Sequence, residues 1–384
     1  MAGKGAVAVV DFGSSTINVV IAERGVNNTF NILGRSEMEY SGYLNGEFLN
    51  EEELYHVLGY SIESAESSCG FKMTEIYVGV PGEFTSVVLK KPVLTFDGKR
   101  RITDVEIDEL FDSGDSFKNH PEYILINRSP IYYTGDDGRL LIDARDEKTS
   151  RLSGQLSYVL AKRKFTDVVS QVLMQYDFKK IEFVSSCLAE SLYLLDAYSR
   201  DRYAVLLDIG YTTTTFMVIR GEGILYMKSF PVGGAHISAD LYECFSVPFH
   251  VAEELKRKIS LTFAVGENDK YEVVSKDKTY TFDARQAHAV VEARLDNIAA
   301  LINKCIKVCD VEFPSYINFK LTGGGISYMR GAKEYLGRAI GKNIDLAKNA
   351  IPQLDYPHMS STYAVLDLAL KQNKPKKFID RVFK

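Results

Sequence analysis

The sequence contains one strand–turn–strand pattern twice, and this repeat limits the possible folds more than any other feature. Each copy is an apolar run, an Asp, one apolar residue, a Gly, several residues that mostly bear hydroxyls, and a second apolar run. The copies align without a gap, as VAVVDFGSSTINVVIA at 7–22 and AVLLDIGYTTTTFMVI at 204–219. Two apolar runs around a tight turn predict a β-hairpin. Two copies in one chain predict two similar α/β halves.

The turn in each copy is suited to binding phosphate. A Gly at its apex leaves backbone N–H groups and hydroxyls open on one side, without a Cβ in the way. Two such turns facing each other would hold a polyphosphate, whereas a single turn also suits an ordinary hairpin. Asp11 and Asp208 precede the glycines, and a carboxylate is favourable near phosphate when Mg²⁺ lies between them, usually through waters.

A third segment, 321–325, has three consecutive glycines between a predicted strand and a predicted helix start. By itself it would suit a flexible loop. With the two turns present, we interpret it as backbone packed closely against a nucleoside base.

Other segments predict the remaining elements. Residues 84–162 alternate short strand-like runs with turn signals and predict a compact α+β insert. Residues 270–283 predict a polar hairpin. Apolar residues at helical spacing predict helices at 51–66, near 103–113, and at 164–176, 249–260 and 286–308.

Composition excludes several classes of function. The net charge of −5 argues against broad nucleic-acid binding, and we expect no nucleic-acid partner. No apolar run reaches the roughly 18 residues that a membrane span needs. The N-terminus lacks a signal-peptide pattern, and the five Cys are scattered, which favours reduced thiols. These features predict a cytoplasmic protein.

The three motifs resemble those of the actin/Hsp70/sugar-kinase superfamily. The first turn resembles its phosphate 1 motif, the second its phosphate 2 motif, and 321–325 its adenosine motif, in the same order. Within that superfamily the chain is similar to the bacterial FtsA family over nearly its whole length. The run 231–238, followed by 251–256, resembles the pattern P-V-G-G-x-x-I-T and A-E-x-x-K, and the insert falls where that family has its 1C subdomain.

This resemblance implies an α/β, actin-like two-lobed fold, made of duplicated ribonuclease-H-like domains with an α+β 1C-type insert. The implied divisions are subdomain IA at 1–83, 163–200 and 345–370, subdomain 1C at 84–162, subdomain IIA at 201–240 and 319–344, subdomain IIB at 241–318, and a basic amphipathic C-terminal tail at 371–384.

The resemblance also implies ATP and Mg²⁺ in the cleft between the lobes. Glu253 and Lys256 would contact the ribose and base, although a solvated helix charge pair is the alternative for these two. Asp11 and Asp208 would hold Mg²⁺ through water. The implied nucleotide-binding residues are Gly13, Ser14, Ser15, Thr16, Gly210, Tyr211, Thr212, Thr213, Gly233, Glu253, Lys256, Gly323, Gly324 and Gly325.

Two departures from the superfamily pattern bear on hydrolysis. Most relatives have D-I-G-G-G at phosphate 2, whereas Tyr211 and Thr212 stand here at the second and third Gly positions. The acid that usually orients the attacking water is replaced by Ser186, and Glu190 follows about one helical turn later. Asp11, Asp208 and Glu190 are therefore only weak catalytic candidates. We expect at most slow ATP hydrolysis, with the nucleotide acting as an assembly ligand.

The resemblance implies two protein partners, namely the C-terminal peptide of FtsZ on 241–318 and further copies of the chain in an actin-like filament. The helix predicted at 286–308 would offer an acidic peptide cationic and polar contacts, and a solvated face is the alternative. The residues concerned are Arg294, Asn297, Lys304 and Lys307.

The end of the chain predicts a short membrane anchor. Coiled as a helix, its apolar residues form one stripe flanked by cations, which suits an anionic membrane surface. Because about two turns bind weakly, such an anchor would need avidity from polymerisation. A frayed basic end is the alternative. The residues concerned are Phe378, Ile379, Val382 and Phe383 in the stripe, with Lys376, Lys377 and Arg381 beside it.

Together these features predict an FtsA-like, ATP-binding adaptor that polymerises and tethers FtsZ filaments to the membrane. Its expected location is the cytoplasmic face of the cell membrane, at the division site. A PilM-like scaffold for pilus or secretion assembly is the alternative with the same fold. A sugar or acetate kinase fits less well, since no substrate-binding insert with clustered charges is present.

Overall fold

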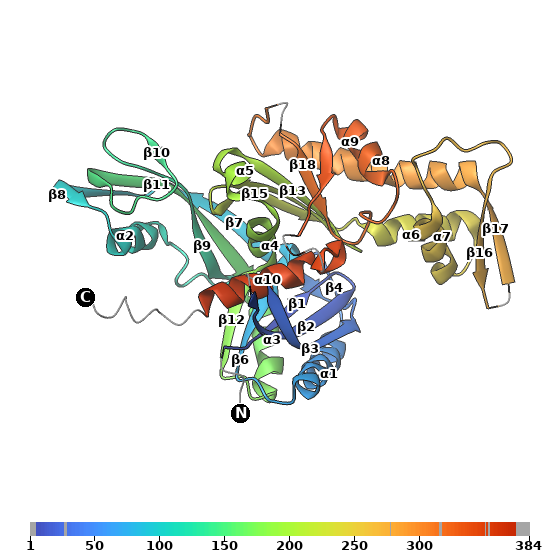
Figure 1. Ribbon diagram of the computed structural model, residues 1–384, viewed down its shortest axis with the longest axis horizontal. Coiled ribbons are helices and arrows are strands. Elements are labelled where there is room, and N and C mark those ends of the chain that lie inside the picture. The colour runs from blue at the N-terminus through green and yellow to red at the C-terminus, as the bar shows by residue number, and fades with distance from the viewer. Residues whose placement is uncertain are drawn as a thin grey trace.

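The computed structural model describes residues 5–26, 29–276, 278–314, 317–349, 351 and 354–373. Its elements form an elongated molecule (Figure 1). Strand β8 (Val93–Arg101) lies at one end, and the hairpin of β16 (Lys270–Ser275) and β17 (Lys278–Asp283) lies at the other. The two repeat copies lie between these ends.

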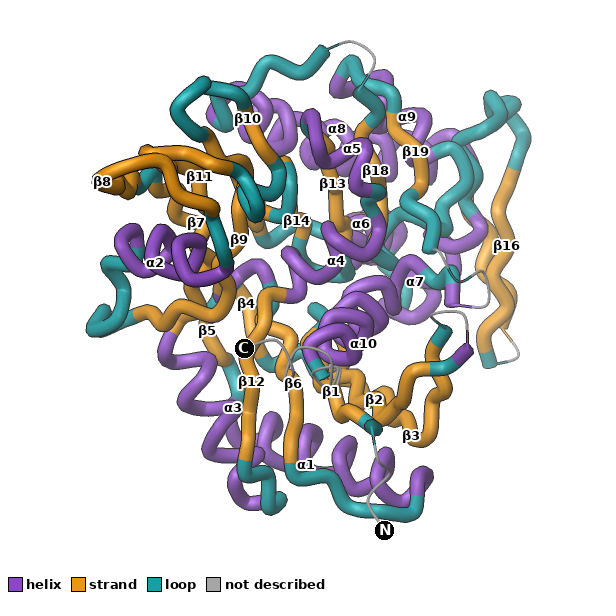
Figure 2. The backbone as a smooth tube through the Cα atoms, turned by 60° about the vertical axis from the view of Figure 1, so that its left-hand side comes forward, coloured by secondary structure: helices purple, strands orange, loops and turns teal. Residues whose placement is uncertain are grey.

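The first repeat copy forms two strands of a five-stranded sheet with the order β12-β6-β1-β2-β3. Strand β1 is antiparallel to β2 and parallel to β6. Successive residues of β1 face opposite sides, so that Val10 packs with α1 and α3 while Val9 packs with α10. Helices α1 and α3 therefore cover one face of this sheet and α10 the other (Figure 2). The bounds are β1 (Val7–Phe12), β2 (Thr16–Arg24), β3 (Phe30–Glu39), β6 (Glu75–Val80), β12 (Lys180–Ser185), α1 (Glu51–Cys69), α3 (Arg163–Gln175) and α10 (Ser360–Gln372).

The second repeat copy builds a sheet of the same design, with the order β15-β14-β13-β18-β19. Leu207 on β13 packs with α6, α7 and α8, whereas its neighbour Leu206 packs with α4. The matching order confirms the predicted duplication and the actin-like fold. The bounds are β13 (Ala204–Ile209), β14 (Thr214–Arg220), β15 (Gly223–Phe230), β18 (Phe319–Thr322), β19 (Ile344–Leu346), α4 (Ser186–Leu194), α5 (Ala197–Arg202), α6 (Gly234–Phe245), α7 (Phe249–Lys258), α8 (Ala284–Val308) and α9 (Ala332–Ile340).

The predicted α+β insert is confirmed as a sheet with the path β10-β9-β11-β7, to which β8 is added through β11. Thr103 and Glu106 form a capping box at the start of α2. The hydroxyl of Ser157 on β11 donates to the carbonyl of Ile224 on β15 at 2.8 Å, which fixes the insert to the second sheet. The bounds are β7 (Thr85–Lys90), α2 (Asp104–Gly114), β9 (Tyr123–Thr134), β10 (Leu140–Leu141) and β11 (Lys148–Lys162).

Four short elements complete the described structure. The strands β4 and β5 pair with each other, and two 3₁₀ turns lie before β7 and before α10. Their bounds are β4 (Tyr43–Leu44), β5 (Glu47–Phe48), η2 (Gly82–Phe84) and η4 (Pro357–Met359).

The structure differs from the sequence prediction around the third glycine segment. The helix expected directly after 325 begins only at Ala332, because the intervening chain makes turns. The N–H of Gly325 donates to the carbonyl of Ile209 at 2.7 Å, which fastens these turns to β13. Strand β19 also continues the second sheet to Leu346, two residues past the expected boundary at 344.

Candidate functional site

The two repeat turns have the same backbone geometry. The N–H of Gly13 donates to the carbonyl of Thr16 at 2.8 Å, and the N–H of Gly210 donates to that of Thr213 at 2.8 Å. The repeated sequence therefore produces two equivalent tight turns, one from each half.

The turns also contact each other. The hydroxyl oxygen of Ser14 accepts hydrogen bonds from the N–H groups of Tyr211, at 3.0 Å, and Thr212, at 3.2 Å. An oxygen acceptor thus lies where two successive N–H groups of the second turn converge, which is the arrangement that binds a phosphate oxygen. The structure brings the predicted phosphate segments together across the two halves.

The third glycine segment packs backbone against backbone on the second turn. A Cβ at Gly325 would lie 2.2 Å from the carbonyl oxygen of Gly210, and a Cβ at Gly233 would lie 2.5 Å from the same atom. Gly323 has φ +85°, a conformation that favours glycine, and its Cβ would lie 2.3 Å from Asp208 Oδ1. Only glycine fits these positions, so all three glycine motifs meet at one place.

Two hydroxyl groups beside this meeting point are buried without a hydrogen-bond partner. They belong to Thr212 in the second turn and to Ser327 just after the third glycine segment. Because an unpaired buried hydroxyl costs free energy, these atoms suit a site that a polar ligand completes. Backbone N–H groups, absent Cβ atoms and unpaired hydroxyls together fit the phosphates and sugar of a nucleotide.

The other residues predicted in the turns make ordinary structural contacts. The carbonyl of Ser15 accepts from the N–H of Tyr40 at 3.0 Å, and the Thr16 hydroxyl accepts from Asn18 at 3.3 Å. Thr213 donates its hydroxyl to Glu83, at the start of the insert. Gly324 lies next to His358, and a Cβ at Gly324 would come within 2.9 Å of the His358 Cβ, too close to fit without a shift.

Two carboxylates near the turns differ in their surroundings. Asp11 is 2% exposed and accepts hydrogen bonds from Ser186, Ser361 and Thr362, at 2.8, 3.0 and 3.0 Å. Burial raises its pKa above the usual range although these bonds oppose the shift. Asp208 has no such donors among the described residues, and burial with repulsion from Asp11 raises its pKa to about 7.

Glu190 is held inside the protein as well. It accepts a hydrogen bond from Ser360 in the first turn of α10, and the Ser360 hydroxyl lies 2.8 Å from that of Thr322. Burial, followed by repulsion from Asp208, raises the pKa of Glu190 well above its usual value.

The side chains around the turns determine how a metal ion could be held at this site. Among the residues that the structure describes, no group of three or more His, Cys, Asp or Glu side chains is arranged to hold a metal. A cation at this site would therefore take most of its ligands from nucleotide phosphates and water, as Mg²⁺ commonly does.

Glu253 and Lys256 on α7 lie against the second turn. Lys256 is 6% exposed, and its ammonium donates to Glu253 Oε2 at 2.9 Å and to the carbonyl of Gly234 at 3.2 Å. The ammonium also lies 5.7 Å from the centre of the Tyr211 ring. Ser238 donates its hydroxyl to Glu253. The sequence did not predict the contacts of Ser238 with Glu253 or of Lys256 with Tyr211, because the partners in each pair lie far apart in the chain.

The residues predicted to contact a peptide lie on α8, but they differ in exposure and in whether they already have a charged partner. Arg294 forms two hydrogen bonds with the Asp240 carboxylate, at 2.6 and 2.7 Å, so its charge is compensated. Asn297, Lys304 and Lys307 are exposed.

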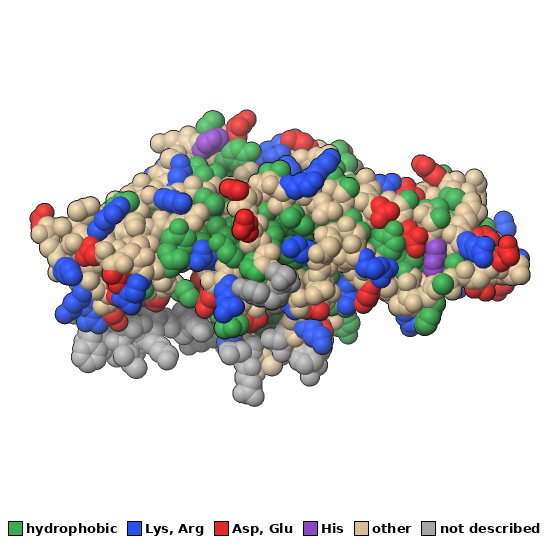
Figure 3. Space-filling model, turned by 90° about the horizontal axis from the view of Figure 1, so that it is seen from above, with side chains coloured by type: hydrophobic (Ala, Val, Ile, Leu, Met, Phe, Trp, Pro, Cys, Tyr) green, Lys and Arg blue, Asp and Glu red, His purple; other side chains and the backbone are tan. Residues whose placement is uncertain are grey.

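The two signs of charge are mixed on one face of the molecule. Figure 3 shows Lys and Arg side chains interspersed with Asp and Glu over the face that it displays.

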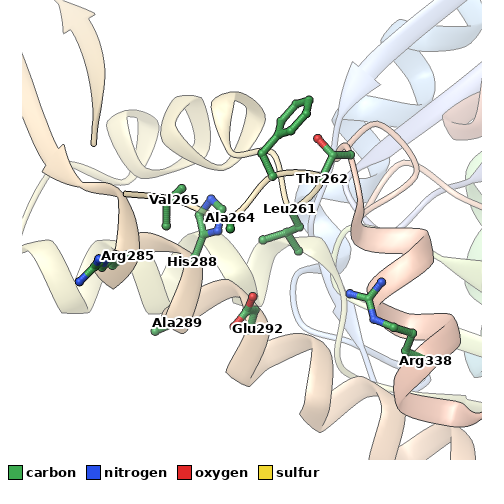
Figure 4. A pocket seen from close by; sticks show the side chains of 10 residues that line it. Leu261, Thr262, Ala264, Val265, Arg285, His288, Ala289, Glu292 and Arg338 are labelled. Carbon is green, nitrogen blue, oxygen red and sulfur yellow. The ribbon is translucent and has the colours of Figure 1, made fainter. Parts of the chain in front are cut away.

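A cavity of about 460 Å³ lies on another side of α8 (Figure 4). Arg285, His288 and Glu292 line it from α8, Arg338 faces it from α9, and residues 261–265 form its remaining wall. Since Arg294 follows Glu292 by two residues, their side chains point to opposite sides of the helix. The cavity and the predicted peptide face are therefore separate surfaces.

The residues predicted as a membrane anchor all lie in 374–384, outside the described residues. The last described helix, α10, ends at Gln372. Within the described part of the chain, no helix is both long and apolar enough to cross a bilayer.

Comparison with known sequences finds similarity to a bacterial cell-division protein. The family model described as cell division protein FtsA matches residues 205–365. FtsA of Bacillus subtilis is 22% identical over 331 residues, which cover 82% of this chain and 72% of that protein. FtsA of Enterococcus hirae is 22% identical over 398 residues, which cover 96% of this chain and 87% of that protein.

Solved structures agree on the fold. The PilM–PilN type IV pilus biogenesis complex matches with a TM-score of 0.63 at 15% identity, covering 96% of this chain and 99% of the matched one. MreB5 of Spiroplasma citri bound to AMPPNP matches with a TM-score of 0.57 at 11% identity, covering 97% and 98%.

Proposed function

Since the chain has an actin-like fold and is similar to bacterial cell division protein FtsA, we propose that it binds ATP and links FtsZ filaments to the membrane as a polymer. The observation that carries the nucleotide part is the contact between the two repeat turns. Two N–H groups of the second turn converge on one oxygen, and the Thr212 hydroxyl beside them has no partner.

In this proposal the nucleotide is held mainly by backbone groups. The turns at 13–16 and 210–213 bind the phosphates, the glycines at 323–325 face the base, and Glu253 and Lys256 lie at the sugar side. Mg²⁺, when bound with ATP, supplies positive charge that neutralises the phosphates in an acidic cleft. Ser14 then exchanges its contacts with the second turn for the phosphate.

Slow hydrolysis is part of the proposal. Ser186, at the position of the usual acid, donates its hydroxyl to Asp11 and cannot accept a proton from water as a carboxylate does. Glu190 is the nearest alternative base by sequence, but Ser360 holds it inside the protein. The nucleotide therefore acts as an assembly ligand.

Binding of ATP and assembly are tested together by titration calorimetry with ATP and Mg²⁺ and by sedimentation of the same samples. Micromolar affinity with more protein in the pellet supports the proposal. Absence of binding contradicts the nucleotide part. Protein without 374–384 serves to separate assembly from any aggregation caused by the apolar tail.

The partner is tested with two peptides. The FtsA relatives favour the C-terminal peptide of FtsZ, which would lie on the exposed part of α8 near Asn297, Lys304 and Lys307. The match to a PilM–PilN complex favours a second candidate, a PilM-like scaffold that binds a short peptide of a membrane protein. Saturable binding of the FtsZ peptide, lost in K304E/K307E, supports the first. Binding of only a PilN-type peptide supports the second.

Membrane attachment is proposed for the tail at 374–384, on the cytoplasmic face at the division site. Flotation with vesicles that contain anionic lipid should retain the full chain and lose the chain truncated after 373. Equal flotation of both would contradict the anchor. The substitution F378E/F383E provides a control of unchanged length.

A further inference from the structure

Asp11 and Asp208 occupy equivalent positions in the two repeat copies, yet their carboxylates have different partners. Asp11 accepts hydrogen bonds from three hydroxyls, two at Oδ1 and one at Oδ2. A carboxylate has about four acceptor sites, so most of those of Asp11 are already occupied. The hydroxyls of Ser361 and Thr362 come from the first turn of α10 and that of Ser186 comes from the first turn of α4.

Packing around Asp11 is tight. A Cβ at Gly79 would lie 2.6 Å from Asp11 Oδ1 and 2.5 Å from the Ser186 hydroxyl oxygen. The Asp11 side chain is 2% exposed. A metal-bound water at Oδ1 would have to replace Ser186 or Ser361 as the donor, and the protein would lose that hydrogen bond.

Asp208 presents the opposite case. No described side chain donates a hydrogen bond to its carboxylate, and the residue, beside the turn at 210–213, keeps a small part of its surface exposed. Gly323 lies against its Oδ1, where any larger residue would fill the space. Of the two repeat aspartates, only Asp208 accepts no hydrogen bond from a described side chain.

We propose that Asp11 is a structural clasp that fastens α10 and α4 to β1, and that Asp208 alone faces the cation accompanying the nucleotide. The second half of this proposal rests on the proposed ATP binding, whereas the clasp stands without it. The repeat thus preserves one aspartate for the fold and the other for the ligand.

The test compares the full chain with D11N, D208N and T362V. Titration calorimetry measures the affinity for ATP with Mg²⁺ and with EDTA, and thermal unfolding without ligand measures the midpoint. D208N should abolish the gain in affinity that Mg²⁺ gives. D11N should keep that gain to within about twofold and, like T362V, should lower the midpoint by about 2 °C or more.

Each outcome of these measurements tests either the role of Asp11 or the role of Asp208. If D11N abolishes the effect of Mg²⁺ as D208N does, or if D11N and T362V unfold at the wild-type midpoint, the proposal is overturned. Failure of D11N to fold while D208N folds supports the clasp. If the wild type binds no ATP at all, the proposed function fails, but the midpoints of D11N and T362V still decide whether Asp11 is a clasp.

Discussion

Replacement of Gly325 by Ala tests whether the three glycine motifs form one site. The added Cβ would lie 2.2 Å from the carbonyl oxygen of Gly210 and 2.7 Å from that of Ile209. Cβ atoms in folded proteins essentially never approach closer than 3.0 Å, so the second turn must move by about 0.8 Å, the difference between 3.0 Å and 2.2 Å. Because both contacts are backbone atoms, no side chain can rotate to relieve the clash. Overpacking of this kind costs about 1–3 kcal/mol.

The shift moves the N–H groups that would hold phosphate, so affinity for ATP should fall about tenfold or more, which corresponds to about 1.4 kcal/mol or more. Urea denaturation measures the first effect and titration calorimetry the second. Gly98→Ala is the matched control, since no atom lies within 4 Å of its added Cβ. A Gly325→Ala protein as stable and as tight for ATP as Gly98→Ala would refute the assignment of 323–325 to the site.

Three further changes have defined outcomes. The pKa of Asp208, about 7 in the folded chain against about 3.9 when unfolded, means that the folded chain holds the proton more tightly. The free energy of unfolding should therefore fall as pH rises from about 4 to about 7. This decrease should be smaller in Asp208→Asn, as measured by urea denaturation at several pH values in that range. Lys256→Met removes the ammonium beside Glu253, which keeps only Ser238 and a longer contact to Arg257. This change should lower the free energy of unfolding by about 2–3 kcal/mol. The double variant Lys256→Met/Glu253→Gln should lose less stability than the two single variants lose in sum. Ser157→Ala removes the donor to Ile224 between the insert and the second sheet, with an expected loss of about 1 kcal/mol by urea denaturation; no loss would mean that the insert is held by its apolar contacts alone.

The sequence could predict the hairpin of each sheet because its signal is local, whereas the edge strands β12 and β19 were not predicted. Each repeat copy carries its two strands and its turn within sixteen residues, and the hydrogen bond from Gly13 to Thr16 spans three. The apolar spacing at 286–308 likewise placed α8 to within two residues at its start. Where a pattern fixes the structure by itself, the expectation and the structure agree.

The details of the candidate site depend on contacts between distant segments. The hydroxyl of Thr362 lies 351 residues from Asp11 in the chain, and nothing near either residue indicates the pairing. Arg294 was expected to be available to a peptide, but Asp240, 54 residues earlier, neutralises it. The contact of Ser14 with Tyr211 likewise exists only because the two halves face each other.

The first turn of α10 joins parts of both halves, and this has a mechanical consequence. Ser360 contacts Thr322 of the second sheet and Glu190 of α4, while Ser361 and Thr362 hold Asp11 of the first sheet. The 13 residues of α10 then extend away from this joint, over about 20 Å at 1.5 Å per residue. At that far end Ala369 and Leu370 are 0% and 4% exposed and pack in the core of the first sheet. The helix and the first sheet would therefore move as one body, and a shift of the second half at Ser360 would be passed to both together.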